Sequence, residues 1–393
     1  MPGPLDGIRI LDFTRYQQGP FATVLLSDLG ADVLKIEEPK NGDLGRSLGR
    51  QSDGFCAYFE AHNRNKRSLT VDLRTDEGRE IILKLVPEFD VVTDNFRPDV
   101  MRRLGLGHDD LKAVNPKIIT ANASGFGSEG PRVAEPSFDC IGQAMGGMMI
   151  AQGGGPEEPP IQLVAGFADQ VGAMIFALGI CSAVVARERQ GIGQHIDCSL
   201  LGTQLAMQSF PITGFLRNRE QRSSPQRLSP TFTYYPCSDG LYLVLGILDP
   251  KWWPGFCTAI NRDDLAMDER FNTPKARNVN NKELVSELDA TFLQKKRSDW
   301  LSILNQADIP CGPVNDYEAM SREPQVLENK YITSLEHPSL GDLDVVGTPI
   351  HLSETPAGPH TCAPELGQHT EEILLDIGYS WEDIEALKNT GVI

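Results

Sequence analysis

The sequence predicts an α/β fold of the Rossmann type, accompanied by a second, smaller domain. From residue 8 to residue 124, short apolar runs typical of strands alternate with helical segments. This order builds a parallel sheet between layers of helices. The chain has 393 residues, more than one simple core accommodates, and this length indicates two domains.

The first elements form a compact βαβ unit. Residues 8–13 predict a strand, Pro20 is well placed to open a helix over 21–30, and Gly30 ends that helix before a strand over 31–37. The loop after the first strand lacks the G-x-G-x-x-G fingerprint, so it gives no indication of a dinucleotide site. The alternation then predicts strands at 68–73, 89–96 and 117–124, with helices from Thr75 to Leu85 and from Pro98 to Arg103.

Basic side chains gather around the loops near these strands. Ligands of such sheets bind beyond the carboxyl ends of the strands, so the loops after Phe13, Leu73, Phe96 and Ser124 should face one crevice. Clustered cations in an acidic chain indicate a phosphate-bearing ligand, and a solvated surface with scattered charges is the alternative interpretation. The basic set comprises Arg64, Lys66, Arg67, Arg74, Arg97, Arg102 and Arg103.

Asp169 is the one charged residue in the stretch 159–186. The segment 170–186 predicts a buried core helix, with Met174, Leu178 and Cys181 recurring on one face. A membrane span does not fit, because Gly and Ser interrupt an apolar stretch that is already short.

Two roles are open for Asp169, and one residue can fill both. An aspartate just before an apolar run is most often an N-cap, where the helix dipole and free N–H groups favour the ionised carboxylate. The other interpretation is a carboxylate held in a nearly dry pocket, where it acts as a nucleophile or a base.

The second half of the chain predicts a linker and a small domain. The run 231–247 predicts two strands joined by a Ser-Asp-Gly turn, and IPCGPV (309–314) indicates a return towards the first domain. The tail is predicted to be helical, with Ser380 as an N-cap and Asp383 completing a capping box. The predicted boundaries are a large domain over 1–215, a linker over 216–230, a small domain over 231–320, and a return linker with the last part of the large domain over 321–393.

Composition excludes several classes of protein. The formal net charge of −18 argues against nucleic acid as the main partner, because phosphate backbones need a basic surface. The N-terminus does not have the pattern of a signal peptide. The eight cysteines are scattered singly without metal-ligand spacing, which predicts buried, reduced thiols, a cytoplasmic type of compartment and no metal site.

Ordered motifs along almost the whole chain point to one family. They are PLDGIRILDFTR (4–15), GPFATVLLSDLGADVLKIE (19–37), NRNKRSLTVDL (63–73), DNFRPDVMRRLGLG (94–107), GFGSEGP (125–131), QAMGGMM (143–149), the helix start at Asp169, IPCGPV (309–314) and ELGQHTEEIL (365–374). In these motifs the sequence resembles the family III CoA-transferases, the group that includes formyl-CoA:oxalate and carnitine CoA-transferases and the α-methylacyl-CoA racemases.

The resemblance implies a Rossmann-like large domain built from both chain ends, a smaller inserted α+β domain, and a homodimer of two interlocked rings. It also implies an enzyme that moves CoA from an acyl-CoA to a small carboxylic acid, with acyl-CoA as a substrate and no tightly bound cofactor. By matching position, Asp169 is the implied nucleophile, forming aspartyl-anhydride and aspartyl-CoA thioester intermediates. Gln17 faces the same pocket, where its amide holds a substrate carboxylate or simply fixes a loop. Arg97 and Arg103 are the implied phosphate contacts, and the wider set expected around the CoA comprises Arg74, Asn95, Phe96, Tyr58 and Phe138.

Two departures from the family pattern bear on function. Some formyl-CoA enzymes carry a run of glycines that folds over the site, whereas the matching LVLGILDP here has one glycine. Racemases have a His before an Asp where this chain has Phe138 before Asp139, so a His base is missing. An acyl-CoA racemase or epimerase, and a non-catalytic CoA-binding protein, are therefore the rival interpretations. The sequence does not identify the acyl groups; for Arg217, Arg219, Arg222 and Arg227 we favour a charged linker over contacts to a second substrate carboxylate.

Overall fold

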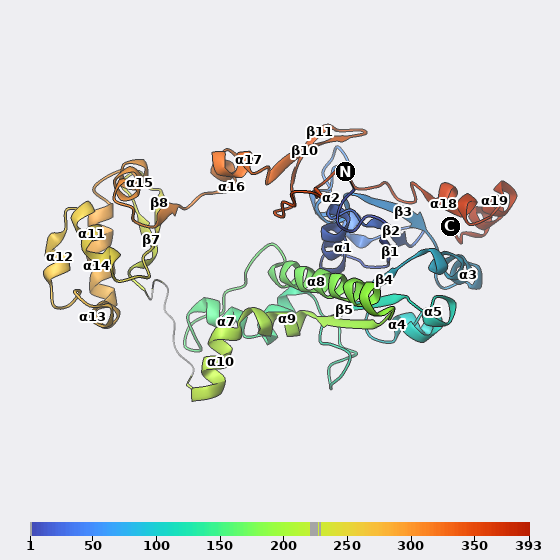
Figure 1. The fold of residues 1–393 in the computed structure, drawn as a ribbon, viewed down its shortest axis with the longest axis horizontal. Coiled ribbons are helices and arrows are strands. Elements are labelled where there is room, and N and C mark those ends of the chain that lie inside the picture. The colour runs from blue at the N-terminus through green and yellow to red at the C-terminus, as the bar shows by residue number, and fades with distance from the viewer. Residues whose placement is uncertain (1, 221–226, 228) are drawn as a thin grey trace. The chain divides into compact units, whose positions relative to one another are not determined.

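The computed structural model describes residues 2–220, 227 and 229–393. The chain folds into two compact units, coloured along the sequence in Figure 1. Unit 1 comprises Met1–Met149, Ile161–Glu220 and Leu327–Ile393, and unit 2 comprises Ile150–Pro160 and Gln221–Val326. The predicted linker over 216–230 falls partly on helix α10 (Ser209–Asn218), and its residues 221–226 and 228 lie outside the described part of the chain.

Unit 1 is built on a six-stranded parallel sheet with the strand order β3-β2-β1-β4-β5-β6. This is the doubly wound order of Rossmann folds, which reverses between β1 and β4. The α/β prediction is therefore confirmed, although the third strand begins and ends earlier than predicted. The strands are β1 (Arg9–Asp12), β2 (Asp32–Glu37), β3 (Lys66–Thr70), β4 (Val91–Asp94), β5 (Ile119–Ser124) and β6 (His195–Ser199).

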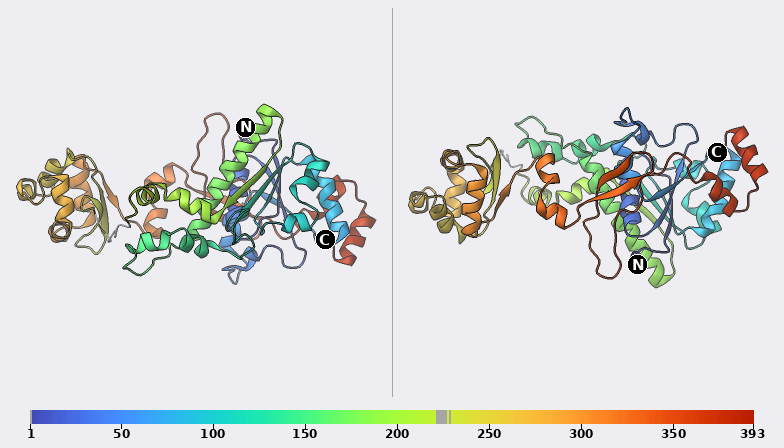
Figure 2. Two further views of the ribbon diagram at one scale, coloured as in Figure 1. Left: turned by 90° about the horizontal axis from the view of Figure 1, so that it is seen from below. Right: turned by 90° about the horizontal axis from the view of Figure 1, so that it is seen from above.

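Helices cover both faces of this sheet (Figure 2). Ile10 and Val33 pack with α1 and α8, whereas the next residues along their strands, Leu11 and Leu34, belong to the core on the opposite face. The alternation follows from the two-residue period of a strand. The covering helices are α1 (Gln18–Asp28) and α8 (Phe167–Gln190) on one face, and α3 (Asp76–Leu85), α5 (His108–Val114), α18 (Thr370–Asp376) and α19 (Trp381–Thr390) on the other.

Helix α8 is longer than predicted and is covered on one side. Phe176 and Ile180 pack into the core between α8, α1 and the sheet. Met174 and Leu178 lie on the other side and are 54% and 61% exposed, so the prediction of an almost wholly buried helix with these residues inside is wrong for the single chain. Among the described residues, α8 is the one helix long and apolar enough to cross a membrane by length and composition, a test that core helices of soluble proteins also pass.

Unit 2 contains a three-stranded antiparallel sheet and a cluster of helices. The two strands predicted over 231–247 are confirmed as β7 (Phe232–Pro236) and β8 (Tyr242–Gly246). Within IPCGPV, Cys311–Pro313 forms β9 and pairs with β8, and the chain re-enters unit 1 at Leu327. Trp300 is buried in the core of this unit and donates its indole N–H to the carbonyl of Phe292 over 2.8 Å.

Two further sequence predictions concern the last helix and the cysteines. The capping box at Ser380 and Asp383 is confirmed at the start of α19. All eight cysteines are free, but Cys140 is exposed, so the expectation that they are all buried is wrong.

The other elements are η1 (Leu44–Ser47), α2 (Ala57–Asn63), η2 (Val86–Glu88), α4 (Val100–Arg103), α6 (Asp139–Met145), α7 (Met148–Gly153), α9 (Leu200–Met207), α11 (Trp252–Ala259), α12 (Asp263–Met267), α13 (Pro274–Val279), α14 (Asn281–Phe292), α15 (Arg297–Gln306), α16 (Tyr317–Ser321), α17 (Pro324–Glu328), and the hairpin β10 (Ile332–His337) with β11 (Gly341–Val346).

Candidate active site

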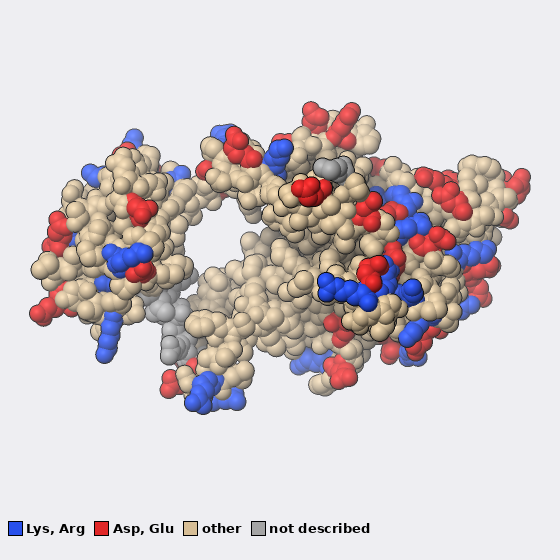
Figure 3. Space-filling model, in the orientation of Figure 1, with Lys and Arg blue, Asp and Glu red and all other residues tan. Residues whose placement is uncertain are grey.

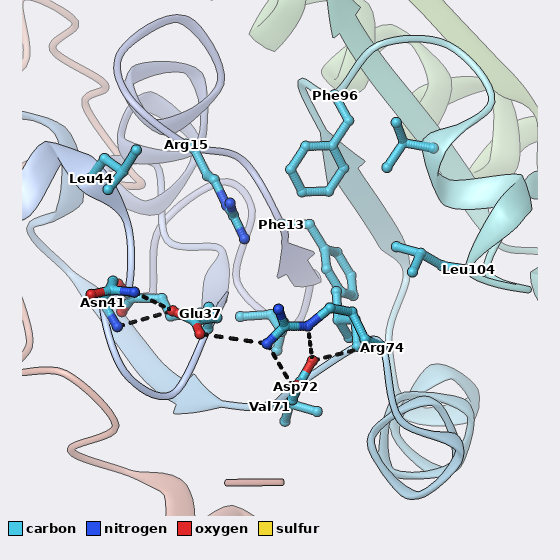
Figure 4. Close-up of a pocket in the computed structure, with 15 residues that line it drawn as sticks. Phe13, Arg15, Glu37, Asn41, Leu44, Val71, Asp72, Arg74, Phe96 and Leu104 are labelled. Carbon is cyan, nitrogen blue, oxygen red and sulfur yellow. Dashed lines mark hydrogen bonds and ion pairs between the residues drawn. The ribbon is translucent and has the colours of Figure 1, made fainter. Parts of the chain in front are cut away.

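A cavity of about 490 Å³ opens in unit 1 at the carboxyl ends of β1 to β4 (Figure 4). This is where the strand order reverses and where doubly wound sheets bind their ligands. Three of the four loops predicted to face one crevice, those after Phe13, Leu73 and Phe96, contribute to its lining, whereas Ser124 does not. Phe13, Phe96 and Leu104 form an apolar wall on one side of the cavity.

Most of the charged side chains in the lining are paired with other side chains of unit 1. Arg74 lines the cavity as predicted, but its guanidinium makes two hydrogen bonds of 2.8 Å to Asp72 and lies 3.7 Å from Glu38. Glu37 receives two hydrogen bonds from Arg46, over 2.7 and 2.8 Å. Arg15, which sequence reasoning missed, extends into the cavity from the loop after β1 (Figure 4).

In that loop, Thr14–Gln17, the backbones of the first three residues are each held by a side chain from elsewhere in unit 1. Lys35 donates to the carbonyl of Thr14 over 2.8 Å, and Asp43 accepts the N–H of Tyr16 over 3.0 Å. Asn95 receives the N–H of Arg15 at 2.8 Å and donates to its carbonyl at 2.7 Å. Asn95, predicted to contact CoA, therefore positions this loop.

Buried charges support the same loop from below. Lys35 and Asp43 form an ion pair of 2.9 Å, and Lys66 and Asp12 form another of 3.0 Å, with all four side chains almost fully buried. Despite its burial, Asp12 keeps a pKa of about 2, because Lys66 and Lys35 stabilise its ionised form. Tyr16 has a φ of +66°, a left-handed conformation that costs a non-glycine residue of the order of 1–3 kcal/mol. The buried anchors explain how the loop keeps this strained shape.

Asp169 lies in the first turn of α8, but it does not cap the helix. Oδ1 of Asp139 accepts the N–H groups of Ala168 and Asp169, over 2.6 and 3.1 Å. Asp139 is itself fixed by Nε2 of Gln143 at 2.7 Å. The N-cap interpretation of Asp169 is therefore wrong, because Asp139, thirty positions earlier, accepts the N–H groups at the start of the helix.

The carboxylate of Asp169 receives no hydrogen bond from any residue that the structure describes. Burial and the neighbouring charge of Asp139 raise the pKa of Asp169 from 3.8 to about 7. This result contradicts the expectation that helix N–H groups favour its ionised form, since Asp139 occupies those groups. A half-buried carboxyl group with a free pair of oxygens and a pKa near neutrality has the character of a catalytic group.

Gln17 and Gly166 meet where the chain enters α8. Nε2 of Gln17 donates to the carbonyl of Ala165 over 3.1 Å and lies 3.4 Å from that of Gly166. Ala165 and Gly166 both have left-handed conformations, with φ of +63° and +65°. A Cβ added to Gly166 would lie 2.2 Å from Nε2 of Gln17. The contact explains why glycine stands here and shows Gln17 fixing the turn before Asp169.

Aromatic and polar side chains surround this end of α8. Burial and the charge of Asp169 raise the pKa of the Tyr58 phenol. His62 contacts the carbonyl of Tyr58 through Nδ1 at 2.6 Å and Gln170 through Nε2 at 3.2 Å. Because a carbonyl can only accept, Nδ1 carries the proton, and burial lowers the pKa of His62 to about 4, so the ring is neutral. Sequence reasoning missed His62 and Gln170, since neither stands out from its neighbours.

The remaining predicted residues lie near these features. Phe138 precedes α6, is 56% exposed and meets the ring of Tyr16 edge-on at 5.6 Å. Arg97 and Arg103 are exposed and form no ion pair within the described part of the chain. They do not line the cavity, although Val100 and Leu104 between and beside them do.

Comparison with known proteins identifies the relatives of this chain. A profile of CoA-transferase family III matches residues 5–370. Succinyl-CoA–D-citramalate CoA-transferase of Chloroflexus aurantiacus is 34% identical, with 100% of this chain and 98% of that protein covered. Succinyl-CoA:glutarate CoA-transferase of Mus musculus is also 34% identical, with coverages of 99% and 90%. Among solved structures, a CAIB/BAIF family protein from Brucella suis has a TM-score of 0.86 at 32% identity, covering 96% of this chain and 100% of that chain.

The chain belongs to CoA-transferase family III. It is an enzyme that transfers CoA between an acyl-CoA and a carboxylic acid. In this family III chain, the residue that follows Phe138 is the helix cap Asp139, whose two oxygens are both engaged. Within the described residues, no cluster of His, Cys, Asp or Glu could hold a metal ion.

Proposed function

We propose that this family III enzyme transfers CoA through covalent intermediates on Asp169. The observation that carries the proposal is the free carboxylate of Asp169 beside a helix start that Asp139 already caps. A carboxylate is a weak nucleophile, but the thioester has a good leaving group, because thiols have a pKa of about 8.5. The pKa of about 7 gives Asp169 a substantial ionised fraction at neutral pH and a more basic oxygen than an ordinary aspartate has.

The reaction balances without a second base. A carboxylate oxygen of Asp169 attacks the thioester carbonyl, the carbon–sulfur bond breaks, CoA leaves as a thiolate, and the acyl group remains on Asp169 as a mixed anhydride. The thiolate then attacks the Asp169 carbonyl, which releases the donor acid and leaves an aspartyl-CoA thioester. The acceptor carboxylate attacks this thioester, the carbon–sulfur bond breaks, and a second mixed anhydride forms as CoA thiolate is expelled. The thiolate then attacks the acceptor carbonyl of that anhydride, which gives the new acyl-CoA and releases Asp169 as a free carboxylate. No carbon–hydrogen bond breaks, so the route fits a site whose second carboxylate, Asp139, serves as a helix cap.

The cavity at the ends of β1 to β4 is the proposed site for the adenosine part of CoA. Its apolar wall suits a purine ring, and Phe96 presents an aromatic face to it. Arg97 and Arg103 are proposed to contact phosphate from the rim, since both are exposed and unpaired with any described acidic residue. The acyl end would then meet Asp169 close to Tyr58 and Phe138.

The proposed substrates are succinyl-CoA and a second small carboxylic acid. Two relatives that match this chain over almost its full length are named for succinyl-CoA with citramalate and with glutarate. Both acceptors are dicarboxylic acids. Arg227, one candidate for reaching a second carboxylate, already makes hydrogen bonds of 2.7 and 2.9 Å to Asp289, and Arg222 lies outside the described residues.

A homodimer is proposed as the working form. Large apolar side chains are exposed along α8, α9 and α10, including Met174, Leu178, Leu205 and Phe210. Figure 3 shows few charged side chains over α9 and the first half of α8. Exposed apolar area of this extent marks an interaction surface, and the interlocked dimer implied by the family resemblance would cover it. A dimer that survives nanomolar dilution is expected, and a folded monomer in sedimentation experiments would contradict interlocking.

Isotope and acceptor experiments test the proposed reaction. Succinyl-CoA is incubated with a panel of mono- and dicarboxylic acids, and new acyl-CoA species are identified by mass spectrometry. Transfer to at least one dicarboxylic acid is expected, and it should be lost in Asp169→Ala. In heavy water, a 2-methylacyl-CoA should take up no α-deuterium beyond the enzyme-free control. Enzyme-dependent deuteration without transfer would favour a racemase.

A further inference from the structure

The cavity at the ends of β1 to β4 contains two cationic side chains, and one of them is available to a ligand. Arg74 is paired with Asp72 and lies near Glu38, and the third acidic residue of the lining, Glu37, is held by Arg46. No acidic side chain among the described residues forms an ion pair with Arg15. An unneutralised guanidinium that lines a cavity is a site for an anion.

Arg15 is also aimed at the cavity by its surroundings. Asn95 holds both the N–H and the carbonyl of Arg15, which fixes the backbone from which the side chain extends. The guanidinium lies over the ring of Phe96, with its central carbon 5.4 Å from the ring centre. Figure 4 shows the side chain running from this loop between Leu44 and Phe96 into the cavity. This contact with an aromatic ring uses none of the N–H groups of Arg15 as donors to oxygen, so they remain available to an anion.

We propose that Arg15 binds the diphosphate of CoA, an assignment that rests on the proposed function of the cavity as the adenosine site. Arg15 precedes Gln17 by two residues, and Gln17 contacts the turn that leads into the helix of Asp169. The Thr14–Gln17 loop therefore connects the cavity with the nucleophile. In CoA the diphosphate connects adenosine with the pantetheine arm that carries the acyl group. Arg15, between the cavity and the turn before Asp169, would thus meet the diphosphate that links adenosine to the pantetheine arm, rather than the 3′-phosphate of the ribose.

At this position Arg15 would affect the orientation of the thioester in the reaction as well as the affinity for CoA. A guanidinium can donate two parallel N–H groups to phosphate oxygens, which fixes the direction in which the ligand leaves the cavity. The ligand arm would then run along a loop whose shape is set by Lys35, Asp43 and Asn95. Binding energy from the remote diphosphate could in this way orient the thioester at Asp169.

Calorimetric titrations with three ligands test the assignment. CoA carries both phosphate groups, 3′-dephospho-CoA keeps only the diphosphate, and adenosine 3′-phosphate keeps only the 3′-phosphate. Arg15→Ala should weaken the binding of CoA and of 3′-dephospho-CoA by the same factor, about 10- to 100-fold, and leave adenosine 3′-phosphate unchanged. Arg15→Lys keeps a positive charge but not the two parallel N–H donors of the guanidinium, so its affinity for CoA should fall less than that of Arg15→Ala. Arg322→Ala is the matched control, because Arg322 is an exposed arginine that is paired with Glu318 and lies outside the basic set.

Each other result of these titrations overturns the assignment. A loss seen with adenosine 3′-phosphate but absent with 3′-dephospho-CoA would move Arg15 to the 3′-phosphate. An equal loss with all three ligands would indicate damage to the cavity, and no loss would remove Arg15 from the site. Transfer assays on the same preparations separate this result from the proposed function: wild-type enzyme that binds CoA through Arg15 but transfers none would refute the function and leave the assignment standing.

Discussion

Substituting Gly166 by alanine should damage the enzyme more than the same substitution at the other end of the same helix. The glycines Gly166 and Gly191 flank α8, with φ of +65° and +72°, so an alanine at either position pays about 1–2 kcal/mol for the left-handed conformation. Their surroundings differ. A Cβ at Gly191 meets nothing within 4 Å, whereas a Cβ at Gly166 lies 2.2 to 2.5 Å from the amide of Gln17.

The difference between the two variants measures the contact with Gln17. In Gly166→Ala the amide must move and lose its hydrogen bond to Ala165 and the longer one to Gly166, each worth about 1 kcal/mol. We therefore expect Gly166→Ala to lose about 2–4 kcal/mol of stability and Gly191→Ala about 1–2 kcal/mol. Only Gly166→Ala should also slow CoA transfer, because it shifts the turn that positions Asp169.

Urea unfolding followed by circular dichroism, together with initial rates of transfer from succinyl-CoA, provides the assay. Adding Gln17→Ala to Gly166→Ala should recover part of the stability, since the clashing amide is gone, and the double-mutant cycle should be non-additive. Equal losses at Gly166 and Gly191, or strictly additive effects of the two substitutions, would refute this account of the helix entry.

Two further predictions follow from the pKa of Asp169. The transfer rate should rise with pH as Asp169 ionises, with a midpoint near its pKa of about 7. Asp139→Asn should move this midpoint to lower pH, because the substitution removes the neighbouring charge. A pH–rate profile with an unmoved midpoint would show that the two carboxylates are not coupled. Because folding raises this pKa from 3.8, the ionised form destabilises the folded state, an effect that is absent below pH 3.8 and complete above about pH 7. At pH 8 the free energy of unfolding of Asp169→Asn should therefore exceed that of the wild type by up to about 4 kcal/mol, and below pH 3.8 the two should not differ. Thermal unfolding that shows no difference between variant and wild type at either pH would contradict this.

Local sequence patterns predicted the elements of the sheet and several turns. The runs 8–13 and 31–37 became β1 and β2, Gly30 adopts a φ of +102° after α1, and Ser380 caps α19. Each of these features depends on residues close together in the chain. Apolar periodicity and capping chemistry act over this range, so the sequence carries the signal directly.

Features that depend on distant residues were missed or misread. The N-cap role, one of the two left open for Asp169, belongs to Asp139, and no local pattern reveals this because Asp139 lies on a different element. The availability of Arg15 follows from the pairing of Arg74 with Asp72, and its direction follows from Asn95. Periodicity alone also could not tell which side of α8 packs on the sheet, because Met174 and Leu178 are as apolar as the side chains that do. Such facts come from packing in three dimensions.

Trapping the covalent intermediate tests the central claim most directly. The enzyme is incubated with succinyl-CoA, treated with hydroxylamine, digested and analysed by mass spectrometry, with the peptide that carries Asp139 as an internal control. We expect a hydroxamate at Asp169, formed only when acyl-CoA is present and in step with the loss of activity, and an unmodified Asp139. Loss of activity with Asp169 unmodified, or modification of Asp139 in its place, would contradict the assignment of Asp169 as the nucleophile.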